Sequence, residues 1–375
     1  MARRGANQGS IRAVSTNKWR LRKDYYTPDG RRKWIDETIS GSKKQAEARM
    51  SEIKDMLKIG IVPSGNTLNE FLNQWLAITK QNVKPKTHYD YQNILKYARK
   101  KLGHVTLQDL RGDHIQSLYS EMLDNGLSTR TVKLLHVVLG SALKAAVKWG
   151  HLSYSPTERA TAPKQRRKEI KAWSREEVKV FLKGISEHKH QNVYKLLLYT
   201  GIRRAEVCGL TWSDVDLDGK TLTIRRNLQR IVGEGLTEGT PKTNKSFRKI
   251  ALASAAVDTF RKQRSTQSET RLSAGSAWND TNKVFTNDFG NPIDPDKLTT
   301  EFKSLVENTT LTKITLHGLR HTFASLSIMA KVDAKIMSES LGHSSVSFTL
   351  DTYGHLFPSQ KQEAADAFDI FLKTG

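Results

Sequence analysis

Two short segments without apolar periodicity divide the 375-residue chain into three parts with different patterns. Residues 59 to 66, "IGIVPSGN", contain the Pro, Ser and Gly that are typical of a linker. A second linker, residues 160 to 173, carries five Lys or Arg and one Glu. Since no single periodicity crosses these segments, we expect a multidomain protein with domains at residues 1–60, 67–160 and 173–375.

The first part alternates with the period of a β-strand and then changes to helical spacing. A Pro-Asp-Gly turn at residues 28 to 30 predicts a hairpin, and a helix is expected from Ser42. We therefore expect a small three-stranded β-sheet backed by one helix. Its cations, interleaved with aromatic residues, predict a reader of a DNA groove rather than an adaptor with a solvated basic face. The candidate DNA contacts are Arg20, Arg22, Arg31 and Arg32.

The second part has helical spacing throughout. An apolar stripe with the 3.6-residue period follows Thr67. Three further helices are expected after Pro85, over about 112 to 124, and from Ser128. These stripes predict the core of an all-α domain.

The third part mixes both periods and predicts a mixed, mainly α domain. Residues 174 to 177, "SREE", form a capping box that predicts a helix start. A strand region is expected over residues 219 to 251, with helices before and after it. Residues 265 to 280 are polar, and we expect a mobile loop there.

The charge of the chain indicates a polyanionic partner. Sixty-one Lys and Arg against 38 Asp and Glu give a formal net charge of +23, and neutralised phosphates release counterions that favour binding. The N-terminus lacks the apolar segment of a secretory signal, and a single cysteine, Cys208, suits a reducing compartment. We therefore expect a protein of a reducing compartment that binds a polyanion.

The segment "HGLRH" places His317 and His321 four residues apart, as in a zinc site. The position of the catalytic glutamate in such a site is Gly318, however, and the neighbouring Arg320 opposes a metal cation. We therefore expect no metal. His317 and Arg320, three residues apart on a helix, suit a phosphate oxyanion instead. Ordinary surface hydrogen bonds are the alternative that this segment alone leaves open.

Three further segments carry candidate groups. "TGIRRAE" places Arg203 at the start of a helix, where an anion is favoured, and Glu206 can hold its guanidinium. "PKTNKSFR" places Lys242 at a turn between strand-like runs. In "LGHSSVSFTLDTYGH", His343 follows a Leu-Gly helix stop and Tyr353 comes ten residues later.

In this order the motifs "TGIR", "PKTNKSFR", "HGLRH", "LGHSS" and "DTYGH" resemble those of the tyrosine recombinase (phage integrase) family. The resemblance covers residues 173 to 357 and, in outline, the helical part as a core-site DNA-binding domain. Residues 1 to 60 resemble the arm-type DNA-binding domain of integrases.

The resemblance implies a site-specific recombinase that cuts and rejoins DNA through a 3′-phosphotyrosyl intermediate and so integrates and excises a mobile element. Tyr353 would be the nucleophile, and Lys242 would protonate the leaving 5′-oxygen. His317 would also be the acid/base partner of the tyrosine hydroxyl. The transition state would be stabilised by Arg203, Arg320, His317 and His343.

The resemblance also implies partners. Four protomers would act on two DNA duplexes in the cytoplasm of a bacterial host, without metal, ATP or another cofactor. The second linker would cross the DNA backbone, and its candidate contacts are Lys164, Arg166, Arg167 and Lys168. The motifs do not encode the attachment sites, the host, or any directionality factor or host DNA-bending protein.

Three other proteins could carry these motifs. A chromosome-dimer resolvase shares them, but the basic N-terminal 60 residues argue against it. A regulator that only binds DNA would not need the complete set of catalytic positions. A type IB topoisomerase would relax supercoils without a specific site. Of the neighbouring residues, we expect His321 to pack or cap, Arg204 to point away from the site, and Cys208 to be an inert core thiol.

Overall fold

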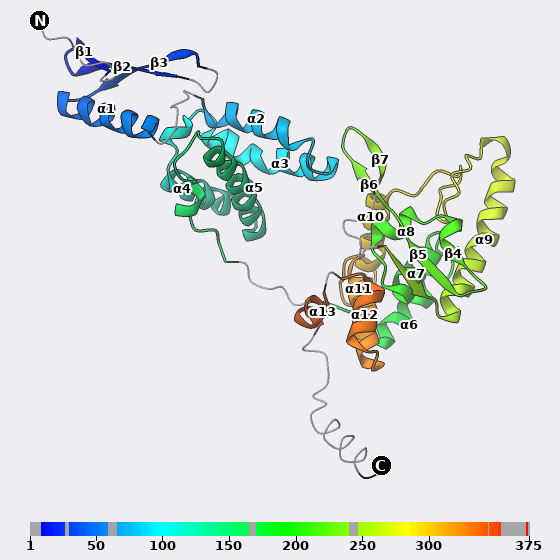
Figure 1. Cartoon of the computed structure of the whole chain (residues 1–375). Coiled ribbons are helices and arrows are strands. Elements are labelled where there is room, and N and C mark those ends of the chain that lie inside the picture. The colour runs from blue at the N-terminus through cyan, green and yellow to red at the C-terminus, as the bar shows by residue number, and fades with distance from the viewer. Residues whose placement is uncertain are drawn as a thin grey trace, which may run out of the picture. The chain divides into compact units, whose positions relative to one another are not determined.

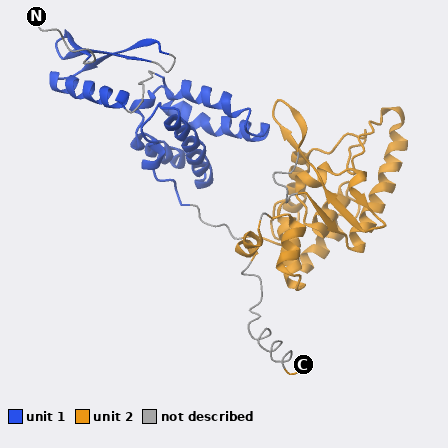
Figure 2. Ribbon diagram, in the orientation of Figure 1, with its two compact units in different colours: residues 1–167 blue, residues 168–375 orange. Residues whose placement is uncertain are grey.

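The structure is a computed structural model that describes residues 9–26, 30–58, 66–164, 170–239, 247–343, 345–353 and 373. The chain divides into two compact units, residues 1–167 and residues 168–375 (Figure 2). The boundary between the units falls within the second linker. The finer division into three domains stays a prediction.

A three-stranded antiparallel sheet begins the first unit (Figure 1). Strands β1 (Ser10–Ser15), β2 (Lys18–Tyr26) and β3 (Arg32–Ser40) lie in that order, and helix α1 (Lys43–Lys58) packs on one face. The predicted sheet with one helix is confirmed, although Pro28 and Asp29 of the predicted turn lie outside the described residues. Five apolar side chains form the core between sheet and helix: Leu21, Ile35, Ala46, Met50 and Ile53.

The other face of this sheet carries exposed arginines. Strand register places Arg22 opposite Asp36, and Arg20 lies one pair further along on the same face. Arg20 donates Nε and Nη2 to the two Asp36 oxygens, each over 2.6 Å. The guanidinium carbons of Arg22 and Arg32 lie 4.5 and 4.7 Å from the Trp34 ring centroid. This face therefore presents fixed cations and an aromatic ring to solvent.

The second predicted part is helical, as expected. Thr67 accepts from the Glu70 amide while the Glu70 carboxylate accepts from the Thr67 amide, so a capping box starts the first helix. Ser128 caps the last one. The predicted apolar stripes form one core cluster. The helices are α2 (Leu68–Thr79), α3 (Pro85–Leu102), α4 (Gly112–Asp124) and α5 (Thr129–Lys148), with 3₁₀ turns at Leu107–Asp109 and Pro156–Arg159.

The second unit surrounds small sheets with helices, in agreement with the mixed, mainly α prediction. Strands β4 (Val215–Asp216), β5 (Thr221–Ile224) and β8 (Arg248–Ala251) form one antiparallel sheet, and β6 (Asn227–Ile231) pairs with β7 (Gly235–Gly239). The helices are α6 (Arg175–Gly184), α7 (Gln191–Thr200), α8 (Arg204–Gly209), α9 (Ser254–Ala274), α10 (Pro295–Glu307), α11 (Gly318–Met329), α12 (Ala334–Leu341) and α13 (Val346–Tyr353), with 3₁₀ turns at Trp212–Asp214 and Gly275–Ala277. Among the described residues no helix is long and apolar enough to cross a membrane.

The prediction of a mobile loop at residues 265 to 280 is wrong. Helix α9 continues to Ala274 and a 3₁₀ turn follows it. Tertiary hydrogen bonds hold this polar stretch: the Trp212 indole donates to Gln267 over 2.6 Å, and Gln267 donates to the Lys283 carbonyl over 2.8 Å. Polar composition predicted a loop because these partners lie elsewhere in the sequence.

Candidate active site

The turn between α7 and α8 positions the first candidate arginine. Gly201 ends α7 with φ of +61°, and a Cβ atom there would also collide with the Phe323 ring. The chain then places Arg203 directly before α8, as the sequence predicted. The Arg203 guanidinium donates to Glu206 Oε1 over 2.8 Å and to the Gly342 carbonyl over 2.9 Å. Its side chain keeps 36% of its surface exposed, so it can meet a ligand.

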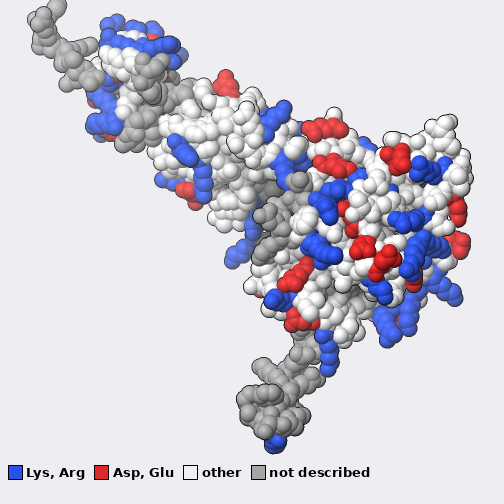
Figure 3. Space-filling view, turned by 45° about the vertical axis from the view of Figure 1, so that its right-hand side comes forward, with Lys and Arg blue, Asp and Glu red and all other residues white. Residues whose placement is uncertain are grey.

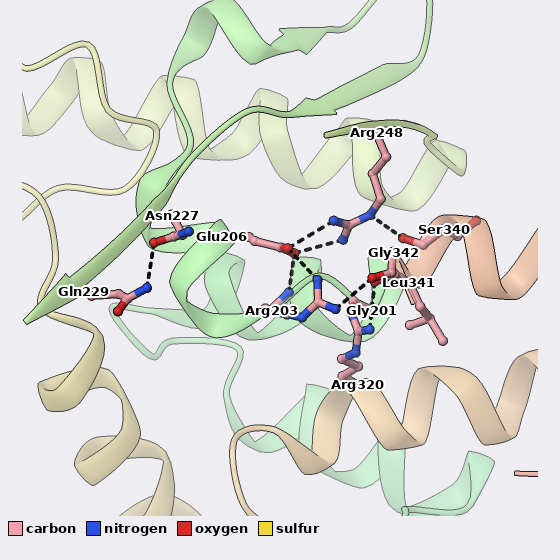
Figure 4. Close-up of polar contacts among 10 residues, drawn as sticks. All are labelled: Gly201, Arg203, Glu206, Asn227, Gln229, Arg248, Arg320, Ser340, Leu341 and Gly342. Carbon is pink, nitrogen blue, oxygen red and sulfur yellow. Dashed lines mark hydrogen bonds and ion pairs between the residues drawn. The ribbon is translucent and has the colours of Figure 1, made fainter. Parts of the chain in front are cut away.

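Glu206 is the buried carboxylate of the site (Figure 4). It accepts from Arg203 as predicted, and it also accepts two hydrogen bonds from Arg248, over 3.0 and 2.9 Å. Burial alone would raise the pKa of Glu206, but the hydrogen bonds and charge of Arg248, together with Arg203, lower it below its ordinary value. Glu206 is therefore ionised at neutral pH and holds both guanidinium groups.

Arg320 lies deeper than Arg203. Only 3% of its surface is exposed, and it donates to the Gly201 carbonyl over 2.8 Å and to the Leu341 carbonyl over 2.7 Å. Burial, together with the charge of Arg203, lowers its pKa to about 9, so the guanidinium stays charged at pH 7. Arg204, by contrast, donates to Asp296 over 3.0 Å and turns away from the site, as predicted.

The C-terminal end of α12 binds three different arginines. The carbonyls of Ser340, Leu341 and Gly342 accept from Arg248, Arg320 and Arg203 respectively (Figure 4). The last carbonyls of a helix lack partners within the helix and carry its partial negative charge, which suits cations. Gly342 ends α12 with φ of +64°.

The candidate nucleophile, Tyr353, is the last residue of α13 and is 1% exposed. It packs among apolar side chains of α11 and α12, and its hydroxyl lies 2.6 Å from His321 Nδ1. Burial raises the pKa of Tyr353 to about 12, although the charge of Arg320 opposes this. The hydroxyl is therefore neutral at pH 7 and needs a proton acceptor before it can attack.

Two further histidines lie in the same region. His317 precedes α11, and the rings of His317 and His321 meet edge to face with centroids 4.9 Å apart. His343 Nδ1 lies 2.6 Å from the Thr349 hydroxyl of α13. Desolvation and nearby cations lower the pKa of His317 to about 4 and that of His343 to about 3. Both are therefore neutral at pH 7.

The other predicted residues are not among the described residues of this site. Lys242, Arg166, Arg167 and Lys168 lie outside the described residues. Lys164, Arg20, Arg22, Arg31 and Arg32 are exposed on the first unit. Cys208 is a buried thiol whose pKa burial raises to about 12, which agrees with the predicted inert role. Among the described residues no group of three His, Cys, Asp or Glu side chains could hold a metal ion.

The sequence-based interpretation missed two residues of this site. His321 was expected only to pack or cap, yet it contacts the tyrosine hydroxyl; its spacing of four from His317 already placed both rings on one helix face. Arg248 lies in a strand of alternating burial, where an arginine is normally expected on the solvent side. Its contacts come from Glu206 and Ser340, far away in sequence, so no local signal marked it.

Solved structures define the class of fold. The Tn1549 transposon integrase in complex with transposon right end DNA matches with a TM-score of 0.68 at 22% identity, over 76% of this chain and 94% of that chain. A lambda integrase dimer bound to a COC′ core site matches with a TM-score of 0.58 at 18% identity, over 94% and 96%. The fold is that of the tyrosine recombinase integrases.

Sequence comparison identifies the family. Residues 173–360 match the phage integrase family, and residues 67–123 match the phage integrase N-terminal SAM-like domain. The protein "Tyrosine recombinase XerC-like" of Caldanaerobacter subterraneus subsp. tengcongensis is 29% identical over 96% of this chain and 100% of its own length. The ICEBs1 integrase of Bacillus subtilis is 26% identical over 80% and 81%. The chain therefore belongs to the phage integrase family of tyrosine recombinases, which are site-specific DNA recombinases.

Proposed function

We propose that this recombinase uses Tyr353 to cut and rejoin DNA at the attachment sites of a mobile element. The observation that carries the proposal is the meeting of four chain segments at one place. Arg203 and Arg320 both donate to the end of α12, directly before His343, while Tyr353 packs against α11 and α12. Two cations at the end of α12, against which Tyr353 also packs, suit a reaction that builds negative charge on a phosphate.

The proposed reaction exchanges one phosphodiester for another. The Tyr353 oxygen attacks the scissile phosphorus, the bond from phosphorus to the 5′-oxygen breaks, and Lys242 gives a proton to that oxygen. Arg203 and Arg320 stabilise the charge of the phosphorane-like transition state, and each such donor contributes about 3–4 kcal/mol. A 5′-hydroxyl of the partner strand then attacks the phosphotyrosine and releases Tyr353. Because the ester conserves the bond energy, no nucleotide cofactor is needed.

We assign the phenolic proton to His321. Its Nδ1 lies 2.6 Å from the Tyr353 hydroxyl, whereas the sequence predicted His317 for this role. Burial and Arg320 lower the pKa of His321, so its imidazole is neutral at pH 7 and can accept a proton. His321→Phe should therefore lower the rate of adduct formation by about 100-fold. If only His317→Phe removes the pH dependence of the rate, the role belongs to His317.

The proposed partners are the core and arm sequences of double-stranded DNA. Four protomers would hold two duplexes in the cytoplasm of a bacterial host. Lambda integrase forms a dimer on a core site and a tetramer on a Holliday junction, which supports this assembly. A directionality factor or a host DNA-bending protein would act as an additional partner that sets the direction of recombination.

A nicked suicide duplex tests the proposed function. The duplex carries the candidate core site from DNA that flanks the gene, and the nick lets the cut strand diffuse away. Wild-type protein in EDTA should form an SDS-stable protein–DNA adduct, and Tyr353→Phe should form none. Tight binding without an adduct on any flanking site would contradict the recombinase proposal.

A further inference from the structure

A buried arginine, Arg248, shares the carboxylate of Glu206 with the partly exposed Arg203. Arg248 is the first residue of β8 and is almost fully buried. Its Nε donates to the Ser340 carbonyl over 2.8 Å, and its Nη1 and Nη2 donate to the two Glu206 oxygens over 3.0 and 2.9 Å. One planar guanidinium thus joins α8 to the end of α12 (Figure 4).

The two arginines that contact Glu206 differ in their exposure to solvent. Arg203 keeps 36% of its side chain exposed, whereas Arg248 keeps 7%. A phosphate can meet the exposed guanidinium of Arg203. In Arg248, by contrast, Nε, Nη1 and Nη2 all donate to Ser340 and Glu206 within the protein. Since taking a charge pair out of water is a poor source of stability, a buried pair beside a reactive site suggests a role in orientation.

The contacts of Glu206 show how the orientation would be transmitted. Its Oε1 accepts from the Arg203 side chain, and its Oε2 accepts from the Arg203 amide over 2.8 Å. Arg248 donates to both of these oxygens and so fixes the plane of the carboxylate. With that plane fixed, only a narrow set of Arg203 rotamers lets its guanidinium donate to both Glu206 Oε1 and the Gly342 carbonyl.

The same guanidinium also lies against the end of α12. A Cβ atom on Gly342 would lie 2.8 Å from Arg248 Nη1, so the backbone before His343 passes close against this side chain. The Gly342 carbonyl in turn accepts from Arg203. Arg248 therefore contacts, directly or through Glu206, both Arg203 and Gly342, the residue before His343.

We propose that Arg248 is a positioning residue that fixes Arg203, through Glu206, to the end of α12 from which His343 extends. This inference rests on the proposed function, because Arg203 and His343 act on the scissile phosphate only in that reaction. Arg248→Lys keeps the charge but cannot bridge both carboxylate oxygens and the Ser340 carbonyl with one planar group. It should slow the chemical step and leave DNA binding intact.

The test is single-turnover cleavage of the nicked core-site duplex by the full chain, with the DNA dissociation constant and Tm measured alongside. Arg248→Lys should slow adduct formation about 30-fold while the dissociation constant changes less than threefold. Arg226→Lys is the matched control, since Arg226 also donates to a buried carboxylate, Asp214, over 3.0 Å. The control should cleave at nearly the wild-type rate.

A modified substrate separates positioning from general damage. A duplex whose scissile phosphate carries a methyl group in place of one non-bridging oxygen builds less charge for Arg203 to stabilise. On this substrate, the difference in the rate of adduct formation between wild type and Arg248→Lys should shrink at least fivefold. The reason is that the reaction depends less on the charge of Arg203, which the substitution misplaces. A defect of equal size on both substrates would overturn the proposal.

Other outcomes also decide the question. If Arg248→Lys cleaves at the wild-type rate, the positioning role is overturned. The role is also overturned if the Tm of Arg248→Lys lies well below that of Arg226→Lys, because Arg248 would then be structural. Arg248→Gln is a second variant without charge, and it should cleave more slowly than Arg248→Lys. If wild-type protein forms no adduct at all, the proposed function fails rather than this inference.

Discussion

The N-terminal sheet and the active site both gather arginines, but the two regions hold them differently. On the sheet, Arg20 pairs with a carboxylate at the surface, and Arg22 and Arg32 lie over an exposed indole. In the active site, Arg320 is 3% exposed and is held by backbone carbonyls. Figure 3 shows mostly Lys and Arg over the sheet, whereas the second unit shows both signs of charge.

This difference in burial suggests that the sheet arginines attract DNA and that the active-site arginines act in the reaction. Exposed arginines keep their hydration and can follow a nucleic-acid backbone, so their contribution should depend on salt. Buried arginines lose hydration once, on folding, and are then oriented before any substrate arrives. The comparison predicts that substitutions on the sheet change binding and that substitutions around Glu206 change reaction rate.

The largest expected effect is that of Arg320→Ala. Removing a charge oriented at the phosphate should lower cleavage about 1000-fold, because one such donor contributes a factor of about 100 to 1000. DNA binding should change only a few-fold, since Arg320 is buried in the free chain. Cleavage of the nicked duplex and a binding titration measure both. A loss of binding as large as the loss of cleavage would erase the distinction between the two regions.

Glu206→Gln should have the next largest effect. The amide cannot balance two guanidinium charges, so the second unit should lose about 3 kcal/mol of unfolding free energy, the cost of an uncompensated buried charge. Urea unfolding measures this loss, and cleavage should fall about 100-fold through Arg203. Unchanged stability would mean that water already screens Arg248, contrary to its burial.

Acid should weaken the active site before it weakens the sheet. His317 and His343 take up protons only near pH 4 and pH 3 in the folded chain, but near pH 6.5 when unfolded. Their contribution to stability is therefore complete above pH 6.5 and is lost as pH falls toward 4. Residues 1–60 contain no histidine. Hydrogen exchange at pH 7 and pH 4.5 should show opening of the second unit first, and a double His→Gln variant should show less of it. Earlier opening of the sheet would contradict the prediction.

The smallest effect is expected on the sheet. Arg22→Gln should weaken binding to arm-site DNA a few-fold and lower the salt dependence by about one counterion, while the Tm and the cleavage rate stay unchanged. Titrations at several salt concentrations provide the slope. Thr38→Gln on the same strand pair is a neutral control. A change in cleavage of the core-site duplex by Arg22→Gln would show that the two regions are coupled.

Local signals predicted the fold well where structure is locally determined. The capping box at Ser174 marked a helix start, and the Leu-Gly stop at Gly342 marked a helix end, because each depends on residues within one turn. Helix α9 was missed where its stability comes from Trp212 and the carbonyl of Lys283.

The site followed the same rule. Arg203, Arg320 and Tyr353 stand in motifs that the family resemblance could match. Arg248 is defined by a partner 42 residues away, so only the folded chain identifies it. His321 stands in the motif "HGLRH", but its contact with Tyr353, 32 residues away, is found only in the folded chain. Residues that touch the substrate leave a pattern in sequence more readily than residues that hold them.

The buried thiol of Cys208 gives the molecule a practical property. It is the single cysteine of the chain, and burial together with its raised pKa keeps it from forming the thiolate that maleimides attack. A cysteine introduced on the sheet and another on α9 would therefore accept fluorescent dyes selectively in the otherwise native protein. Energy transfer between the dyes could then measure, molecule by molecule, whether the distance between the sheet and α9 changes when DNA is added.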